Sequence, residues 1–94
     1  MPEVKMAHRE LTIVNKLGLH ARAAAKLVTL ASKFESDITI KRGEQEVNAK
    51  SIMGVMMLAA SRGTRLIILA DGEDEQDAID SLEKLVGEKF GEQE

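Results

Sequence analysis

Strand-like and helix-like apolar patterns alternate along this 94-residue chain, and their order limits what it can fold into. Period-two alternation or a short apolar run marks strands, whereas apolar residues spaced three and four apart mark amphipathic helices. Strands are predicted over residues 8–14, 36–42, 45–50 and 64–70, and helices over residues 21–34, 52–60 and from 74 onward. The resulting order, β-α-β-β-α-β-α, predicts an α+β two-layer sandwich with helices on one side of the sheet.

The length suits one small domain and leaves no room for two. We expect the domain to span residues 8–90, with a flexible leader over residues 1–7 and a frayed C-terminus over residues 91–94. Within the domain, Gly63 is expected at the left-handed position that ends the second helix. Phe90 is expected on the buried stripe of the last helix.

Composition removes several classes of chemistry. The chain has no Cys and only two His, which excludes disulfides and thiolate sites and argues against a metal site, so we expect no metal and no cofactor. The longest apolar runs, residues 55–60 and 66–70, are far short of the ~20 residues of a spanning helix. With a charged N-terminal stretch and no signal-peptide pattern, a cytoplasmic protein without membrane contact is expected.

Charge is distributed unevenly. Residues 1–70 carry 11 basic and 6 acidic side chains, whereas residues 71–94 carry 2 basic and 10 acidic ones. A basic segment can indicate nucleic-acid binding. Phe34 and Phe90 are the only aromatic residues, too few for base stacking, so no nucleic-acid partner is expected.

His20 lies between a glycine turn at Gly18 and the predicted start of a helix. Backbone N–H groups in the first helical turn have no intrahelical acceptor, so a phosphoryl group on the imidazole would meet several donors. Arg22, in the same turn, offers the planar guanidinium that suits a phosphate. The pattern is that of a phosphoryl acceptor, but a surface histidine without a role also fits it. His8 lies away from any helix start and is assigned no role.

The second helix begins at Ser51, a residue type that caps helices through its hydroxyl oxygen. Ile52, Met53, Met56 and Met57 follow it. Core packing is the ordinary role of such residues, but successive helical residues lie about 100° apart, so all four cannot face inward.

Arg22, Lys26, Thr29 and Lys33 recur at steps of four, three and four on the first helix. They predict one polar, basic stripe. A solvated helix face is the simpler interpretation, and a docking surface for acidic partners is the other.

Two segments resemble one known family. Residues 18–22 (GLHAR) are similar to the active-site segment of the HPr family, the histidine phosphocarrier proteins of the bacterial phosphotransferase system. Residues 50–56 (KSIMGVM) are similar to that family's regulatory-serine segment, in which Ser51 lies 31 positions after His20. The resemblance covers about residues 8–90 and implies an open-faced sandwich, with a four-stranded antiparallel sheet and three helices on one face.

The resemblance implies that phospho-Enzyme I phosphorylates His20 on Nδ1 and that His20 passes the group to IIA-type proteins. Arg22 would stabilise the phosphorylated state. The chain would then be a monomeric substrate of transferases, with no catalytic turnover of its own.

By the same resemblance, Ile52, Met53 and Met56 form an exposed apolar patch on which partners dock, with Lys26 adding positive charge. Ser51 matches the serine that the HPr kinase/phosphorylase modifies, and whether it is modified here is left open.

One position departs from the family pattern, His-x-Arg-Pro: Ala23 stands where the proline is expected. Alanine is an excellent helix former, so the fold prediction is unaffected, whereas equivalence in transfer rate or partner choice is not implied.

Two alternative functions stay open. One is a carrier of the nitrogen-regulatory phosphotransferase branch, which signals instead of supplying sugar transport. The other is a small α+β regulatory or ligand-binding domain without covalent chemistry.

Overall fold

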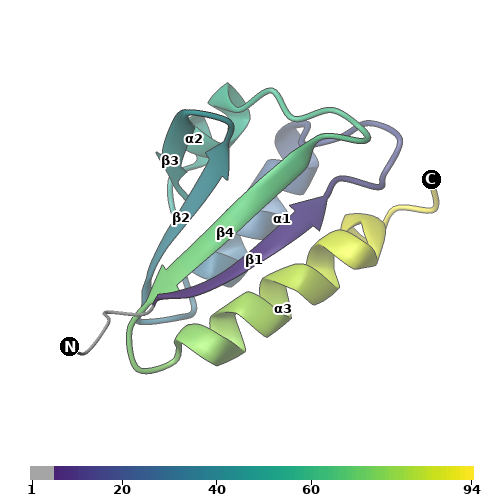
Figure 1. Cartoon of the computed structure of the whole chain (residues 1–94). Helices are drawn as coiled ribbons and strands as arrows, with labels where there is room; N and C mark the ends of the chain where they lie inside the picture. Colours follow the sequence, from purple (N-terminus) through teal and green to yellow (C-terminus); the bar gives the residue numbers. More distant parts are fainter. Residues whose placement is uncertain (1–5) are drawn as a thin grey trace.

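A computed structural model describes residues 6–94 and confirms the predicted order of elements (Figure 1). The strands are β1 (Ala7–Thr12), β2 (Asp37–Arg42), β3 (Gln45–Asn48) and β4 (Arg65–Asp71), and the helices are α1 (Ala21–Ala31), α2 (Ile52–Met57), α3 (Glu75–Gly87) and the 3₁₀ helix η1 (Lys89–Gly91). Residues 1–5 of the predicted leader lie outside the described part of the chain, and Ala7 already pairs in β1.

The four strands form one antiparallel sheet in the order β1-β4-β2-β3 (Figure 1). The apolar β4 lies at the centre, with Leu66, Ile68 and Ala70 buried beneath the helices. Its opposite face is not covered: Ile67 is 38% exposed on the open side of the sheet. The helices therefore lie on one side of the sheet, as predicted.

Helices α1 and α3 cover the inner face of the sheet. Each buries one apolar stripe, which consists of Ala23, Ala24, Leu27 and Ala31 on α1, and of Ala78, Ile79, Leu82 and Val86 on α3. The three alanines of α1 allow the helix to lie close to the sheet, because a methyl group adds little to the distance between backbones.

The short helix α2 is held at both ends by side chains. The Ser51 hydroxyl accepts a hydrogen bond from the Gly54 N–H at 3.1 Å, which confirms the predicted cap. At the other end, the Arg42 guanidinium donates to the carbonyl oxygens of Leu58 at 2.6 Å and Ala59 at 3.1 Å. The last carbonyl groups of a helix have no hydrogen-bond donor within the helix. In the six-residue α2, the β2–β3 hairpin provides donors for the carbonyl groups at this end.

The predicted end of the second helix is wrong in position and in residue. The helix stops at Met57, and Ala59 adopts the left-handed conformation after it, with φ of 50°. Gly63, the predicted terminator, has φ of 89° in the following turn. An L-residue in this region is strained, since its Cβ crowds the backbone.

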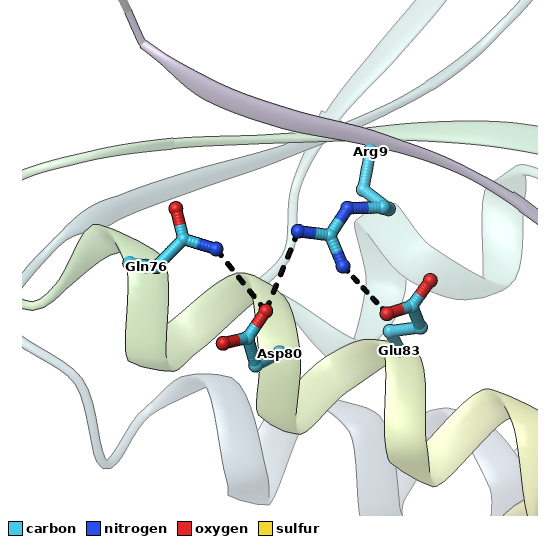
Figure 2. Close-up of polar contacts among 4 residues, drawn as sticks. All are labelled: Arg9, Gln76, Asp80 and Glu83. Carbon is cyan, nitrogen blue, oxygen red and sulfur yellow. Dashed lines mark hydrogen bonds and ion pairs between the residues drawn. The ribbon is translucent and has the colours of Figure 1, made fainter.

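A charged cluster joins β1 to α3 on the edge of the sheet (Figure 2). The Arg9 guanidinium contacts Glu83 at 2.5 Å and Asp80 at 3.4 Å, and Gln76 donates to the same Asp80 oxygen at 3.1 Å. The acidic face of α3 therefore has a cation opposite it on the edge strand.

The chain leaves the helical path after α3, and its end lies near the segment that precedes α1. Lys89 and Phe90 have φ of 59° and 56°, so the buried Phe90 leaves the helical path in place of extending it. The Lys26 ammonium donates to the Phe90 carbonyl oxygen at 2.6 Å. The Lys16 N–H donates to the Glu94 carbonyl oxygen at 2.5 Å, so the C-terminal segment lies beside the chain that leaves β1 (Figure 1).

Candidate functional site

His20 is the N-cap residue of α1, in an extended backbone conformation. A turn closed by a hydrogen bond from the Gly18 N–H to the Asn15 carbonyl at 3.2 Å precedes it. Next to it, buried Leu19 donates its N–H to the Ala60 carbonyl at 2.8 Å. The backbone on the N-terminal side of His20 is therefore anchored to the chain that follows α2.

The imidazole of His20 lies at the surface, with 29% of the side chain exposed. The His20 carbonyl accepts from the Ala24 N–H at 2.8 Å, and the amides of Ala21, Arg22 and Ala23 lie in the turn before that bond. The ring itself makes no capping hydrogen bond to them. It borders an open pocket of about 450 Å³ that is lined by Lys16, Leu17, His20, Arg22, Glu92, Gln93 and Glu94. The structure thus brings His20 and Arg22, both predicted site residues, to one pocket.

A carboxylate from the C-terminal segment lies against the ring. The His20 Nε2 contacts the Glu92 Oε2. The Asn15 Nδ2 donates to the Glu92 Oε1 at 3.0 Å and to the Gly18 carbonyl at 2.8 Å. These hydrogen bonds from Asn15 and His20 hold the pKa of Glu92 below its ordinary value, against the opposite effect of partial burial.

Sequence reasoning did not find Glu92 or the role of Asn15. His20 and Glu92 are 72 positions apart, and residues 91–94 carry no periodic pattern that would predict a structured end. One weak signal is available: Phe90 is a large apolar residue next to Gly91, which is typical of a chain that turns back to bury a side chain.

Lys26 has a contact that its sequence position did not predict. It was expected to attract partners, and its ammonium instead lies on the Phe90 carbonyl oxygen, while its positive charge also lowers the pKa of Glu92. Lys26 therefore supports the C-terminal segment, and its docking role remains a prediction.

The α2 apolar surface consists of Ile52, Met53, Met56 and Met57, and all four side chains are exposed. Met53 is exposed by 72% and Met57 by 66%, whereas Val55 on the same helix is fully buried. Core packing is therefore excluded as the role of these four residues. Met57 belongs to the surface although sequence reasoning placed only the other three there.

Ser51 lies at the N-terminus of α2, partly exposed, with its hydroxyl oxygen bonded to the Gly54 N–H. The cap fixes the start of the helix that carries the apolar surface.

Nothing in the described region suggests a metal or a membrane segment. Within residues 6–94, no group of three His, Cys, Asp or Glu is arranged to hold a metal ion. No helix of that region has the length and apolar character needed to cross a bilayer.

The fold and the site define a class: a small open-faced α+β protein that presents one histidine at a helix start and an exposed apolar surface on another helix. The family model described as "PTS HPr component phosphorylation site" matches residues 7–88. The chain belongs to this HPr family of the phosphotransferase system.

Relatives and solved structures agree with this assignment. The chain is 54% identical over 89 residues to "Phosphocarrier protein HPr" of Cupriavidus necator, covering 95% of this chain and all of that protein. It is also 48% identical over 84 residues to "Phosphocarrier protein NPr" of Shewanella violacea, covering 89% and 92% of the two chains. The structure resembles that of HPr-C-His from Thermoanaerobacter tengcongensis with a TM-score of 0.92, at 47% identity, covering 95% of this chain and 100% of that one.

Proposed function

We propose that this chain is a phosphocarrier that accepts a phosphoryl group on His20 Nδ1 from phospho-Enzyme I and donates it to IIA-type proteins in the cytoplasm. The observation that carries the proposal is the position of His20, which lies partly exposed at the N-terminus of α1 and shares an open pocket with Arg22. The nearby amides of the first turn and the guanidinium of Arg22 are donors suited to phosphoryl oxygens.

The chemistry needs only a nucleophilic nitrogen and anion stabilisation. The Nδ1 lone pair forms a bond to phosphorus while the bond from phosphorus to the donor nitrogen breaks, and the second transfer reverses these roles. A carrier of this kind is a substrate of transferases and turns over no small molecule by itself, and the transfer chemistry at His20 requires no cofactor. We propose that it acts as a monomer.

Docking on partners is assigned to the α2 apolar surface, above all to Ile52, Met53 and Met56. Flexible methionine side chains can adapt to more than one partner, which suits a protein that meets both a donor and several acceptors. Positive charge from Arg22 and Lys26 on the neighbouring helix would speed encounter with acidic partners.

Ser51 is proposed as a regulatory phosphorylation site for an HPr kinase/phosphorylase, on the basis of the family resemblance and its partial exposure. A phosphate there would add about −1.5 to −2 of charge beside the α2 apolar surface and weaken docking there. Treatment with such a kinase should add one phosphoryl mass to the wild type and none to Ser51→Ala.

A carrier of the nitrogen-regulatory branch is the second candidate, favoured by the similarity to the NPr of Shewanella violacea. The two branches differ in the acceptor protein and share the chemistry at His20. Offering the phosphorylated protein a sugar-branch IIA and a nitrogen-branch IIA side by side, and comparing transfer rates, distinguishes them.

The proposal is tested by intact-mass measurement after incubation with Enzyme I and phosphoenolpyruvate. The wild type and the control His8→Ala should each gain one phosphoryl group that is acid-labile and base-stable, and His20→Ala should gain none. An unmodified wild type would contradict the proposal and favour a non-covalent regulatory domain. A modified His20→Ala would contradict it as well, because the phosphoryl acceptor would then be another residue.

A further inference from the structure

We propose that Glu92 is a positioning residue for phosphoryl transfer: it keeps the proton of His20 on Nε2 and stabilises the positive charge that the ring gains when Nδ1 binds phosphorus. This proposal rests on the proposed function of His20. The contact between the Glu92 Oε2 and the His20 Nε2 carries it.

The contact selects one tautomer of the imidazole. An ionised carboxylate can only accept hydrogen bonds, so the nitrogen that faces it must carry the proton. The Glu92 carboxylate faces Nε2, which places the free lone pair on Nδ1. A carboxylate that orients a histidine and supports its cation plays the same part in serine proteases.

Charge conservation gives the contact a second role. When the Nδ1 lone pair forms its bond to phosphorus, the bond to the donor nitrogen breaks and its electron pair stays on the donor. His20 still holds its Nε2 proton, so the ring gains one positive charge. A carboxylate already at that proton binds the charged ring more strongly than the neutral one, and only such a difference accelerates a step.

The structure holds Glu92 in place from several sides. Buried Asn15 donates to Glu92, and its own side-chain oxygen has no partner within residues 6–94. A buried amide oxygen without a hydrogen-bond partner destabilises the fold. Asn15 is held in this orientation, in which its Nδ2 group donates to the Gly18 carbonyl and to Glu92. The Lys26–Phe90 and Lys16–Glu94 hydrogen bonds fasten the segment on both sides of Glu92.

Other charged groups surround the pair, and they define the control. Lys16, Arg22 and Glu94 line the same pocket, and the positive charge of Lys26 on α1 acts on Glu92. Glu88 carries the same charge as Glu92 in the same part of the chain but lies exposed after α3. Glu88→Gln therefore changes the net charge by the same amount as Glu92→Gln without touching the ring.

The test measures transfer kinetics from phospho-Enzyme I to the full chain by rapid quench. Glu92→Ala should lower kcat about 10-fold, the worth of one charge-assisted hydrogen bond. KM should change by less than about two-fold, because the lost interaction forms in the transition state. Glu92→Gln should fall between Glu92→Ala and the wild type, since its amide oxygen can still accept, and Glu88→Gln should match the wild type.

Nitrogen-15 NMR of the His20 ring supplies an independent readout. At about pH 8.5, where an ordinary imidazole is neutral, Glu92→Ala should show more of the tautomer with its proton on Nδ1. Thermal unfolding of each variant confirms that it is folded.

Transfer in Glu92→Ala at the wild-type rate or faster, or a rise in KM without a fall in kcat, would overturn the role of Glu92. An unchanged tautomer balance in Glu92→Ala would do the same. These outcomes leave the carrier function standing, whereas a wild type that accepts no phosphoryl group removes the function itself.

Discussion

A Cβ atom on Gly18 would lie 2.4 Å from the carbonyl oxygen of Ala60, so the turn before His20 packs directly on the chain that follows α2. The Leu19 N–H donates to the same oxygen at 2.8 Å. Gly18 also has φ of +68°, a conformation that favours glycine. One carbonyl group therefore joins the segment that contains His20 to the chain that follows α2.

Gly18→Ala should destabilise the protein for two reasons, the positive φ at this position and the collision of the added Cβ with Ala60. The left-handed conformation costs about 1–2 kcal/mol for a residue with a Cβ, and the collision with Ala60 adds about 1–3 kcal/mol. Gly43→Ala is the matched control, because Gly43 has φ of +59° and nothing within 4 Å of the added atom. Urea unfolding measures both, and equal losses would mean that the chain near Ala60 moves away freely.

Asp74 should give stability a dependence on acid pH. Its carboxylate accepts hydrogen bonds from the Ser36 hydroxyl, from the Ser36 N–H at 3.0 Å and from the Glu35 N–H at 2.8 Å. These bonds, led by that of the Ser36 hydroxyl, lower the pKa of Asp74 from the ordinary 3.8. A depressed folded-state pKa contributes stability that is present above the unfolded value and is lost as the pH falls through the folded one.

Asp74→Asn should therefore lower the thermal midpoint at neutral pH, and its difference from the wild type should shrink below about pH 4. Asp77→Asn, an exposed change of the same charge on α3, serves as the control. A difference between Asp74→Asn and the wild type that stays constant down to pH values at which Asp74 is protonated would rule out the charge as its source.

Ala59→Gly should stabilise the protein by about 0.5–1 kcal/mol. Glycine adopts a φ of 50° without strain, and this gain exceeds the additional conformational entropy that glycine loses when the chain folds. Ala25→Gly, in the interior of α1, should have the opposite effect, a loss of about 0.5–1 kcal/mol. Chemical denaturation gives both signs. Destabilisation by Ala59→Gly would show that its left-handed conformation carries little strain.

The order of elements and the position of His20 could be predicted from the sequence because both depend on local patterns. Period-two alternation, 3.6-residue spacing and the glycine turn before His20 are all readable within a few residues. The Ser51 cap could be predicted for the same reason, because the hydroxyl group bonds to an N–H only three positions away. Helix geometry predicted only that the four apolar residues of α2 could not all face inward, whereas the exposure of Met53 and Met56 in particular was implied by the family resemblance.

The rest of the site depends on contacts between distant positions. Glu92 reaches His20 only because Phe90 leaves the path of α3 and is buried, and no propensity predicts two successive non-glycine residues in the left-handed region. Ala59 likewise ends α2 because Arg42 and the β2–β3 hairpin bind its last carbonyls, although Gly63 has the stronger local preference. Tertiary contacts override local preference at both places.

Met53→Glu should weaken docking without unfolding the protein. Met53 is 72% exposed, so its loss removes little core packing, whereas a carboxylate placed in an apolar interface would be desolvated without a partner. We expect the KM for phospho-Enzyme I to rise about 10-fold, equal to ~1.4 kcal/mol of binding, with an unchanged urea midpoint. Ile67→Glu provides the comparison, since Ile67 is exposed on the open face of the sheet, away from the helices. If both variants raised KM equally, the cause would be added negative charge, and the α2 apolar surface would lose its assignment as the docking site.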